Sequence, residues 1–332
     1  MANMLQRSQP RPASRPPKQA AIAGLLRDLQ CADVRSLAAL VASPQLLATR
    51  VAPIASLTDA WRLDSLLTRR DWLCVLDAHP AELAAHLAGS NARHLGRYAE
   101  ALWQFWLAHM PGARLYASGL PVKDGTAVRG EFDFIVALPG LPGIQHLEMG
   151  YKFYLYCPPG TDWSRMFGPN PIDRLDRKWQ HMLDAQLPLS QTMLGRSALP
   201  PGVSAVEPRA CLQGWLFYPL TAPAPADIEG LSPAHWRGWW CRCSELDNGA
   251  CARWTALAEA WTILPRLSWI APATVRDQNV LLSSAQCREG LGAHFAVSSQ
   301  AQLIAGLSPG DDSAWHESVR VFVVARDWPK AH

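Results

Sequence analysis

The sequence has no long run of apolar residues and little charge of either sign. Asp, Glu, Lys and Arg make up 18% of its 332 residues, below the share of about 25% that is usual in soluble domains. No segment approaches the roughly 20 apolar residues needed to cross a bilayer. The apolar stretch at residues 20–26 is interrupted by Arg27 and Asp28, which argues against a secretory signal. We therefore expect a cytoplasmic protein with no membrane segment.

Several catalytic and metal-binding motifs are also missing. There is no Ser/His/Asp order typical of a hydrolase triad and no internal repeat. Residues 168–170 read Gly-Pro-Asn and lack the glycine spacing and lysine of a phosphate-binding loop. The eight cysteines are dispersed. Cys241, Cys243 and Cys251, even with His235, have poor spacing for zinc, so buried free thiols in a reducing compartment are favoured.

The composition is that of a globular chain. The hydrophobic fraction is 49% and the net charge is +3, so a sizeable core is possible, and a nucleic-acid partner is permitted without being required. Residues 1–19 contain four prolines and no acid, which predicts a disordered basic tail. Residues 20–94 have helical apolar spacing divided by prolines. Residues 95–220 form a predicted α/β core, and residues 221–332 a predicted tryptophan-rich helical region with a late strand packed on the core.

The most informative segment is an apolar, hairpin-like stretch at residues 130–156. In its first run, alternation places Phe132, Phe134 and Val136 on one face of a strand and Glu131 and Asp133 on the other. A Pro/Gly-rich turn follows at residues 139–143.

In the second run, Leu147, Met149, Tyr151, Phe153 and Leu155 share one face. His146, Glu148, Gly150 and Lys152 share the other. Two adjacent antiparallel strands would place Asp133 and Glu148 on one surface, with Lys152 further along it.

Polar residues in two predicted helices complete the candidate set. Glu100 lies within an otherwise apolar helix, three residues after Arg97. A buried acid is costly unless it is paired or bound to a metal, and pairing with Arg97 is the simpler alternative. In the helix that begins near Ile172, the basic residues Arg174, Lys178 and His181 are spaced to share a face.

All of these residues also have an ordinary structural interpretation. Asp133, Glu148 and Lys152 would fit a solvated sheet face with cross-strand ion pairs of small energetic value. A basic helix face is more often solvated surface than a phosphate contact, and tryptophans in apolar surroundings are more often core than stacking platforms.

The order of a helix with Glu100, a strand, a strand with Asp133, a strand with Glu148 and Lys152, and a further helix resembles the core of the PD-(D/E)XK nuclease superfamily. The run Gly130-Glu-Phe-Asp resembles the signature of resolvase-like members. The resemblance covers roughly residues 95–190. It implies a restriction-endonuclease-like mixed sheet flanked by helices. In one respect the chain departs from the pattern, because Gly150 stands two residues before the lysine where the superfamily has an acid.

The resemblance also implies roles for these residues. Asp133 and Glu148, with Glu131 in support, would bind Mg²⁺ or Mn²⁺. Lys152 would orient water or neutralise phosphate charge, and Glu100 would hold a metal-bound water. The residues implied for nucleic-acid contact are Arg174, Lys178, His181 and Gln186.

The chain also resembles an uncharacterised bacterial family, domain-of-unknown-function family 1853. The matching segments are Gly130-Glu-Phe-Asp-Phe, Glu148-x-x-x-Lys152-Phe-Tyr-Leu, Gly168-Pro-Asn-x-x-Asp-Arg-Leu-x-x-Lys178, Gln186-Leu-x-Leu-Ser190 and Gly214-x-Leu-Phe-Tyr-Pro219.

Three functional hypotheses follow from the sequence. The first is a Mg²⁺-dependent nuclease acting on DNA or RNA. The second is a nuclease-fold protein without catalysis, serving as a nucleic-acid-binding or protein-interaction module. The third is a different metal-dependent hydrolase that uses the same acids. Fold alone does not choose among them.

Overall fold

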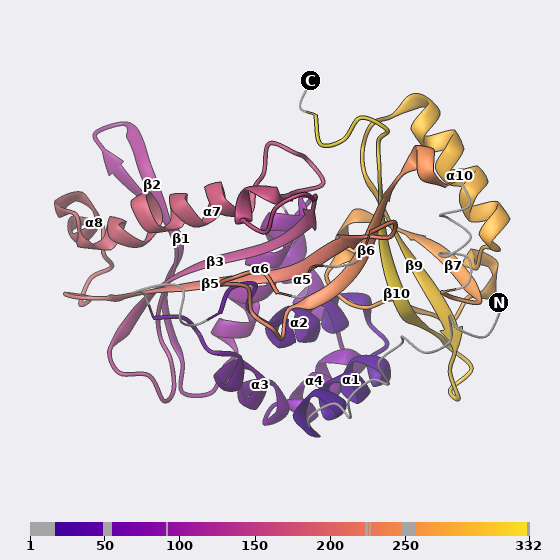
Figure 1. Cartoon of the computed structure of the whole chain (residues 1–332). Helices are drawn as coiled ribbons and strands as arrows, with labels where there is room; N and C mark the ends of the chain where they lie inside the picture. The colour runs from indigo at the N-terminus through magenta and orange to yellow at the C-terminus, as the bar shows by residue number, and fades with distance from the viewer. Residues whose placement is uncertain are drawn as a thin grey trace.

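The computed structural model describes residues 17–48, 55–90, 92–222, 225, 227–246 and 257–330. Within these residues the protein has the mixed α/β architecture that the sequence predicts, with helices flanking one large mixed sheet (Figure 1). Residues 1–16 of the predicted basic tail lie outside the described part, as do Cys251 and Trp254. No helix in the described ranges is long and apolar enough to cross a membrane.

The short helices expected in the N-terminal region are present and pack together on one side of the sheet (Figure 1). Thr58 caps the third of them, since its side-chain oxygen accepts a hydrogen bond from the Trp61 backbone N–H at 3.3 Å. The helices are α1 (Pro17–Asp28), α2 (Ala32–Ala42), α3 (Asp59–Leu67), α4 (Arg70–Ala78), α5 (Ala81–Gly89) and α6 (Leu95–Ala108).

Ten strands within the described residues form the sheet, in the main order β1-β2-β3-β5-β6-β10-β9-β7. The β3–β5, β5–β6 and β6–β10 pairs are parallel, and the other pairs are antiparallel. The strands are β1 (Arg114–Asp124), β2 (Ala127–Ala137), β3 (Ile144–Tyr156), β4 (Met166–Phe167), β5 (Glu207–Pro219), β6 (Trp236–Arg242), β7 (Ala260–Leu264), β8 (Thr274–Val275), β9 (Gln302–Pro309) and β10 (Trp315–Val324).

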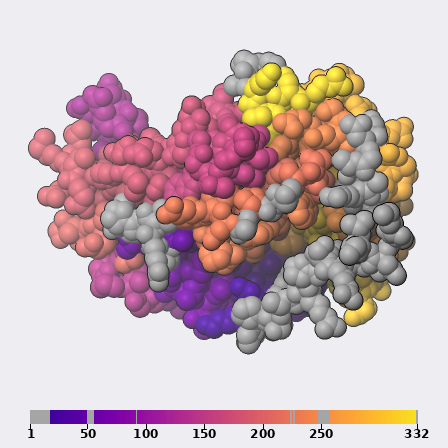
Figure 2. Space-filling view, in the orientation of Figure 1, coloured from indigo at the N-terminus to yellow at the C-terminus, as the bar shows by residue number. Residues whose placement is uncertain are grey.

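The second face of the sheet carries different helices over its two halves. The segment from α7 (Leu175–His181) through a π turn (Met182–Gln186) and a 3-10 turn (Leu187–Gln191) to α8 (Met193–Ser197) covers β2, β3 and β5. Helix α10 (Ser284–Val297) covers the strands of the C-terminal half. The tip of the β1–β2 hairpin projects at the upper left of the molecule (Figure 2).

The C-terminal region differs from its predicted helical character. Trp236, Trp239 and Trp240 lie in β6, and Trp261 lies in β7. Helix α10 contains no tryptophan. The prediction of a tryptophan-rich helix was therefore wrong in the described part of this region. Aromatic side chains favour strands, and a short apolar run does not distinguish a buried strand from a buried helix.

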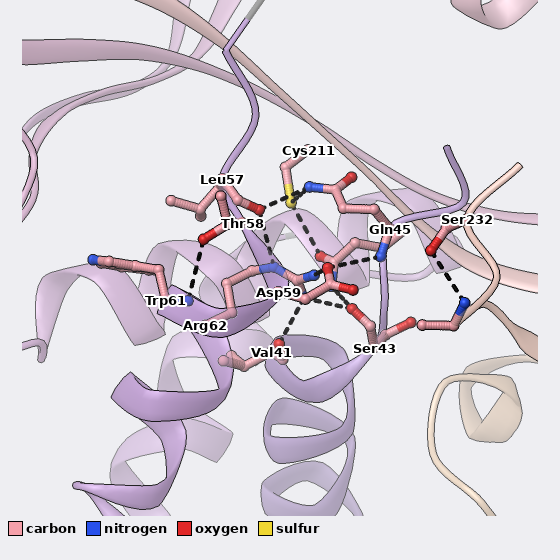
Figure 3. A network of polar contacts seen from close by, with 12 residues as sticks. Val41, Ser43, Gln45, Leu57, Thr58, Asp59, Trp61, Arg62, Cys211 and Ser232 are labelled. Atoms are coloured by element: carbon pink, nitrogen blue, oxygen red, sulfur yellow. Dashed lines mark hydrogen bonds and ion pairs between the residues drawn. The ribbon is translucent and has the colours of Figure 1, made fainter. Parts of the chain in front are cut away.

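A buried arginine joins the N-terminal helices to one another (Figure 3). Arg62 on α3 is fully buried, and its guanidinium donates hydrogen bonds to the carbonyls of Val41 and Ser43 and to the Asp59 carboxylate. Gln45 extends the network to the sheet, because its side-chain oxygen accepts the backbone N–H of Leu212 on β5 at 2.9 Å. These bonds satisfy the buried charge and attach the helical layer to the sheet.

Candidate active site

The candidate site lies where β2 and β3 separate. The two strands pair only from Phe134 opposite Leu147 to Ala137 opposite Ile144. Further along the same edge, β3 pairs with β4 at Leu155 and Tyr156. Between these pairings the backbone N–H of Met149 donates to the Asp133 carboxylate at 2.8 Å. An acid thus takes the place of a strand partner, and the β3 edge opens into a cleft.

The first run of the hairpin does not alternate as predicted. Phe134 packs in the core under the N-terminal helices, whereas Phe132 packs on the opposite side with Ile135. The Phe132 ring also lies edge-on to His146, at 4.7 Å between ring centres. The expectation that Phe132 and Phe134 share a face was therefore wrong. The β1–β2 pair is irregular around this point, with register shifts between Leu115 and Ala117 and between Val122 and Lys123 and a φ of +57° at Gly119. Such irregular pairing accompanies the loss of the period of two.

The second run alternates as the sequence predicts. Leu147 and Met149 contribute to the core beneath the N-terminal helices, and Phe153 and Leu155 continue that face into the C-terminal half. His146 and Glu148 lie on the other face, under the segment after α7. Their side chains touch there.

Glu148 is the centre of a buried polar chain. Its side chain is fully buried, and its Oε1 lies 2.8 Å from the Nε2 of His146. Its Oε2 accepts a hydrogen bond from Gln186 at 2.6 Å. The Gln186 side-chain oxygen in turn accepts from Lys178 Nζ at 2.8 Å. The other ring nitrogen of His146 lies 3.0 Å from the Ser190 hydroxyl. These contacts hold the carboxylate of Glu148 in one orientation.

The acids of the site resist ionisation. Burial, and after it the charge of Glu148, raises the pKa of Asp133 to about 8. Burial raises the pKa of Glu148 to about 7. Burial also lowers the pKa of His146 to about 4, so this ring is neutral near pH 7. Two acids held close together in a poorly solvated site favour either a shared proton or a bound cation.

Two lysines lie near this part of β3, but only Lys178, on α7, interacts with the acids. Lys152 Nζ lies 2.6 Å from the Asp173 carboxylate, which also accepts a hydrogen bond from the Tyr154 hydroxyl at 3.2 Å. Lys178 is close enough to the acids for the charges of Asp133 and Glu148 to favour its charged form, although burial lowers its pKa overall. The two lysines therefore have different partners.

Gly150 leaves the space that Lys178 uses. A Cβ atom at Gly150 would lie 2.8 Å from Leu212 Cδ1 and 3.6 Å from Lys178 Cε. A side chain at this position would therefore crowd Leu212 and lie in contact with Lys178. The packing thus gives a physical reason for glycine where the nuclease pattern has an acid.

Glu100 and Glu131 lie beside Asp133, and both form an ion pair with the same arginine, Arg97. Arg97 Nη1 lies 2.8 Å from Glu100 Oε2 and 3.4 Å from Glu131 Oε1. With Asp133, these side chains line a cavity of about 230 Å³ between α6 and the β1–β2 pair. Glu100 is partly exposed and is not the uncompensated buried acid that the sequence suggested. Its alternative interpretation, an ion pair with Arg97, is confirmed.

A larger cavity of about 700 Å³ adjoins the first. Glu100 lines both cavities, and Gly150, Lys152 and Lys178 line the larger one. Its further walls come from the turn at residues 169–173 and from the C-terminal half of the chain. The unpaired stretch of β3 between its pairings with β2 and β4, here called the strand split, is therefore accessible from a cleft large enough for a small ligand.

Two predicted contact residues do not join the site. Arg174 pairs with Asp176, with 2.9 Å between Arg174 Nε and Asp176 Oδ1. His181 is exposed and lines neither cavity. Conversely, Ser190 and Asp173 contact site residues but were not predicted to do so. His146 was placed only on the face of Glu148, and that shared face was the sequence signal for its contact with the acid.

No group of three or more His, Cys, Asp or Glu side chains in the described ranges is arranged to hold a metal ion. A cation site at the split would therefore depend on the Asp133 and Glu148 pair together with water. Mg²⁺ is commonly held by one or two carboxylates while keeping several waters, so the pair is compatible with this ion.

Comparison with known proteins gives one assignment. No curated protein and no solved structure matches the chain. A family description covers residues 35–324, which is most of the sequence. The chain belongs to the family described as a domain of unknown function, DUF1853.

Proposed function

We propose that this protein is a Mg²⁺- or Mn²⁺-dependent nuclease of the restriction-endonuclease-like type. The order α6, β1, β2, β3, α7 and β5, with β5 parallel to β3, supports the resemblance. The observation that carries the proposal is the acid pair at the strand split. Asp133 and Glu148 are buried together and have raised pKa values. Asp133 lines the smaller cavity, and two lysines line the larger cavity that adjoins it.

The proposed cation would be held by Asp133 and Glu148. When bound, it would make a coordinated water more acidic and stabilise negative charge on the phosphate. The buried pair offers oxygen ligands, and the His146 ring adds no positive charge beside them, because burial keeps it neutral near pH 7. Gln186 and His146 would orient the Glu148 carboxylate, as groups behind metal ligands commonly do.

The lysines would act on the substrate. Lys178 donates to the neutral amide of Gln186, so its charge is available to a phosphate oxygen in the cleft. Lys152 is partly neutralised by Asp173, and in this proposal it orients the attacking water while Asp173 limits its charge. Glu100 and Glu131 would hold outer-shell water on the Arg97 side.

One observation favours the alternative of a nucleic-acid-binding protein without catalysis. Glu148 is fully buried, and both of its carboxylate oxygens already accept hydrogen bonds or contact His146. If these contacts persist with substrate, the second ligand for a cation is lost. The lysines would then provide only phosphate binding.

Cleavage assays separate these two functions. Wild type, Asp133→Asn and Asp184→Asn would be incubated with plasmid, single-stranded DNA and RNA, with Mg²⁺, with Mn²⁺ or with chelator. Asp184 is an exposed acid in the π turn and is the matched control. We expect metal-dependent cleavage by wild type and the control and a loss of at least about 100-fold in Asp133→Asn. Cleavage that survives Asp133→Asn would exclude the proposed site, and salt-dependent binding without cleavage would support the alternative.

A further inference from the structure

The C-terminal half of the chain builds one wall of the large cleft. This wall consists of Arg266 and Trp269 from a 3-10 turn (Arg266–Trp269) and of residues 299–301, just before β9. The opposite side is formed by β3 and by Lys178 on α7. The nuclease-like core alone would leave this side open. A second wall limits which ligands can enter the cleft.

Trp269 is the aromatic residue of this wall, and its neighbours hold it in place. The Trp269 ring packs edge-on against Phe153, at 5.7 Å between ring centres, and against Phe322, at 4.9 Å. Its indole N–H donates to the Leu264 carbonyl at 3.0 Å. Tyr151, which also lines the cleft, packs edge-on against Phe153 at 5.5 Å. These contacts place Tyr151, Phe153 and Trp269 in an aromatic row along the cleft, in which Tyr151 is half-buried and the other two rings are each 5% exposed.

The positively charged side chains of the cleft differ in whether a carboxylate is paired with them. Lys152 is paired with Asp173, and the acid Glu100 is paired with Arg97. Within the described residues, Arg266 and Lys178 line the cleft without a carboxylate ion pair. Arg266 is exposed, and its guanidinium lies 5.3 Å from the centre of the Trp269 ring. These two groups offer positive charge on opposite walls.

We propose that the cleft binds a single strand of nucleic acid, with phosphates at Arg266 and Lys178 and a base against the aromatic row. This inference rests on the proposed function, since it names the form of the nucleic acid. A duplex keeps its base faces stacked inside, whereas a single strand exposes them to aromatic and guanidinium groups. A cleft of about 700 Å³ has the size of a small-molecule site, which suits one or two nucleotides and excludes a double helix.

Binding measured in chelator tests the inference separately from catalysis. Fluorescence anisotropy would follow a labelled oligothymidine strand and the duplex of the same length at several salt concentrations. The variants are Arg266→Gln and the matched control Arg288→Gln, which removes an exposed arginine on α10 outside the cleft. We expect at least tenfold tighter binding of the single strand by wild type and by Arg288→Gln. We expect Arg266→Gln to bind it about 3–10 times more weakly, with a salt slope lower by about 0.7.

The outcomes are distinguishable from those of the cleavage assay. Duplex binding as tight as single-strand binding would overturn the inference even if metal-dependent cleavage is found. An Arg266→Gln variant that binds like Arg288→Gln, with both folded by circular dichroism, would overturn it as well. Single-strand preference that depends on Arg266, with no cleavage under any condition, would support the inference and reject the nuclease.

Discussion

Lys152 Nζ lies 2.6 Å from the carboxylate of Asp173. The lysine that the sequence marks as catalytic is therefore paired with an acid 21 residues later in the chain. Its charge is partly compensated before any substrate arrives. Lys178 instead donates a hydrogen bond to the neutral amide of Gln186.

Removing the acid should release the charge of Lys152. We expect Asp173→Asn to bind a single-stranded oligonucleotide about 2–5 times more tightly than wild type at low salt, because one phosphate contact gains an unpaired cation. Asp184→Asn, which removes an exposed acid outside the cleft, should change affinity less. The measurement is fluorescence anisotropy in chelator. An unchanged affinity in Asp173→Asn would show that Lys152 does not meet the nucleic acid.

Asp133 should make the stability of the protein depend on pH. Its pKa in the folded state is raised to about 8, so the folded protein keeps a proton that the unfolded chain releases. The stability that this proton contributes is fully present below the ordinary pKa of an aspartate and is lost as the pH rises through about 8. The free energy of unfolding of Asp133→Asn, measured relative to that of wild type, should rise by at least about 1.4 kcal/mol from pH 4 to pH 8.

Urea unfolding in chelator at several pH values measures this difference. Asp184→Asn is again the control, and its stability should stay within about 0.5 kcal/mol of wild type at each pH. If the difference between Asp133→Asn and wild type is constant across the range, Asp133 is not the titrating group. With Mg²⁺ added at pH 8, we expect wild type to gain stability and Asp133→Asn to gain little.

Gly150 is predicted to be restricted by packing. A Cβ atom there would lie 2.8 Å from Leu212 Cδ1, and Leu212 is itself buried. We expect Gly150→Ala to lower the free energy of unfolding by about 1–3 kcal/mol, since overpacking forces neighbours to move. The double variant with Leu212→Val should lose less than the sum of the two single changes. Additive losses would show that the two residues do not compete for this space.

Arg62 should be important for stability, in contrast to exposed arginines. It is fully buried and bonded to backbone carbonyls and to Asp59. We expect Arg62→Met to lower the free energy of unfolding by about 3–5 kcal/mol, because Asp59 and the carbonyls lose their hydrogen-bond donor in a buried site. Arg70→Met, which breaks an exposed ion pair with Asp28, should cost less than about 1 kcal/mol. Similar losses for the two variants, measured by urea unfolding, would contradict the role of the network.

The sequence alone was sufficient for features that depend on short-range geometry. The alternation of residues 146–155 follows from the period of two of a strand, and the structure has Leu147 and Phe153 on one face and Glu148 on the other. The short helices of the N-terminal region follow from apolar spacing and proline breaks. The proximity of Asp133 and Glu148 follows from two adjacent strands, although their pairing ends just before Asp133.

Tertiary structure decided the surroundings of each polar group. Whether Glu148 is exposed depends on Gln186, which is 38 residues away in the chain. The partner of Lys152 and the face of Phe132 likewise depend on a loop and on a distorted neighbouring strand. The second wall of the cleft comes from a region more than 100 residues after β3, in which β6 and β7 were predicted as helix and the late strand corresponds to β10. Local periodicity fixes which way a side chain points, but burial and charge pairing are set by whatever segments pack against it, and those contacts are not encoded at any fixed spacing.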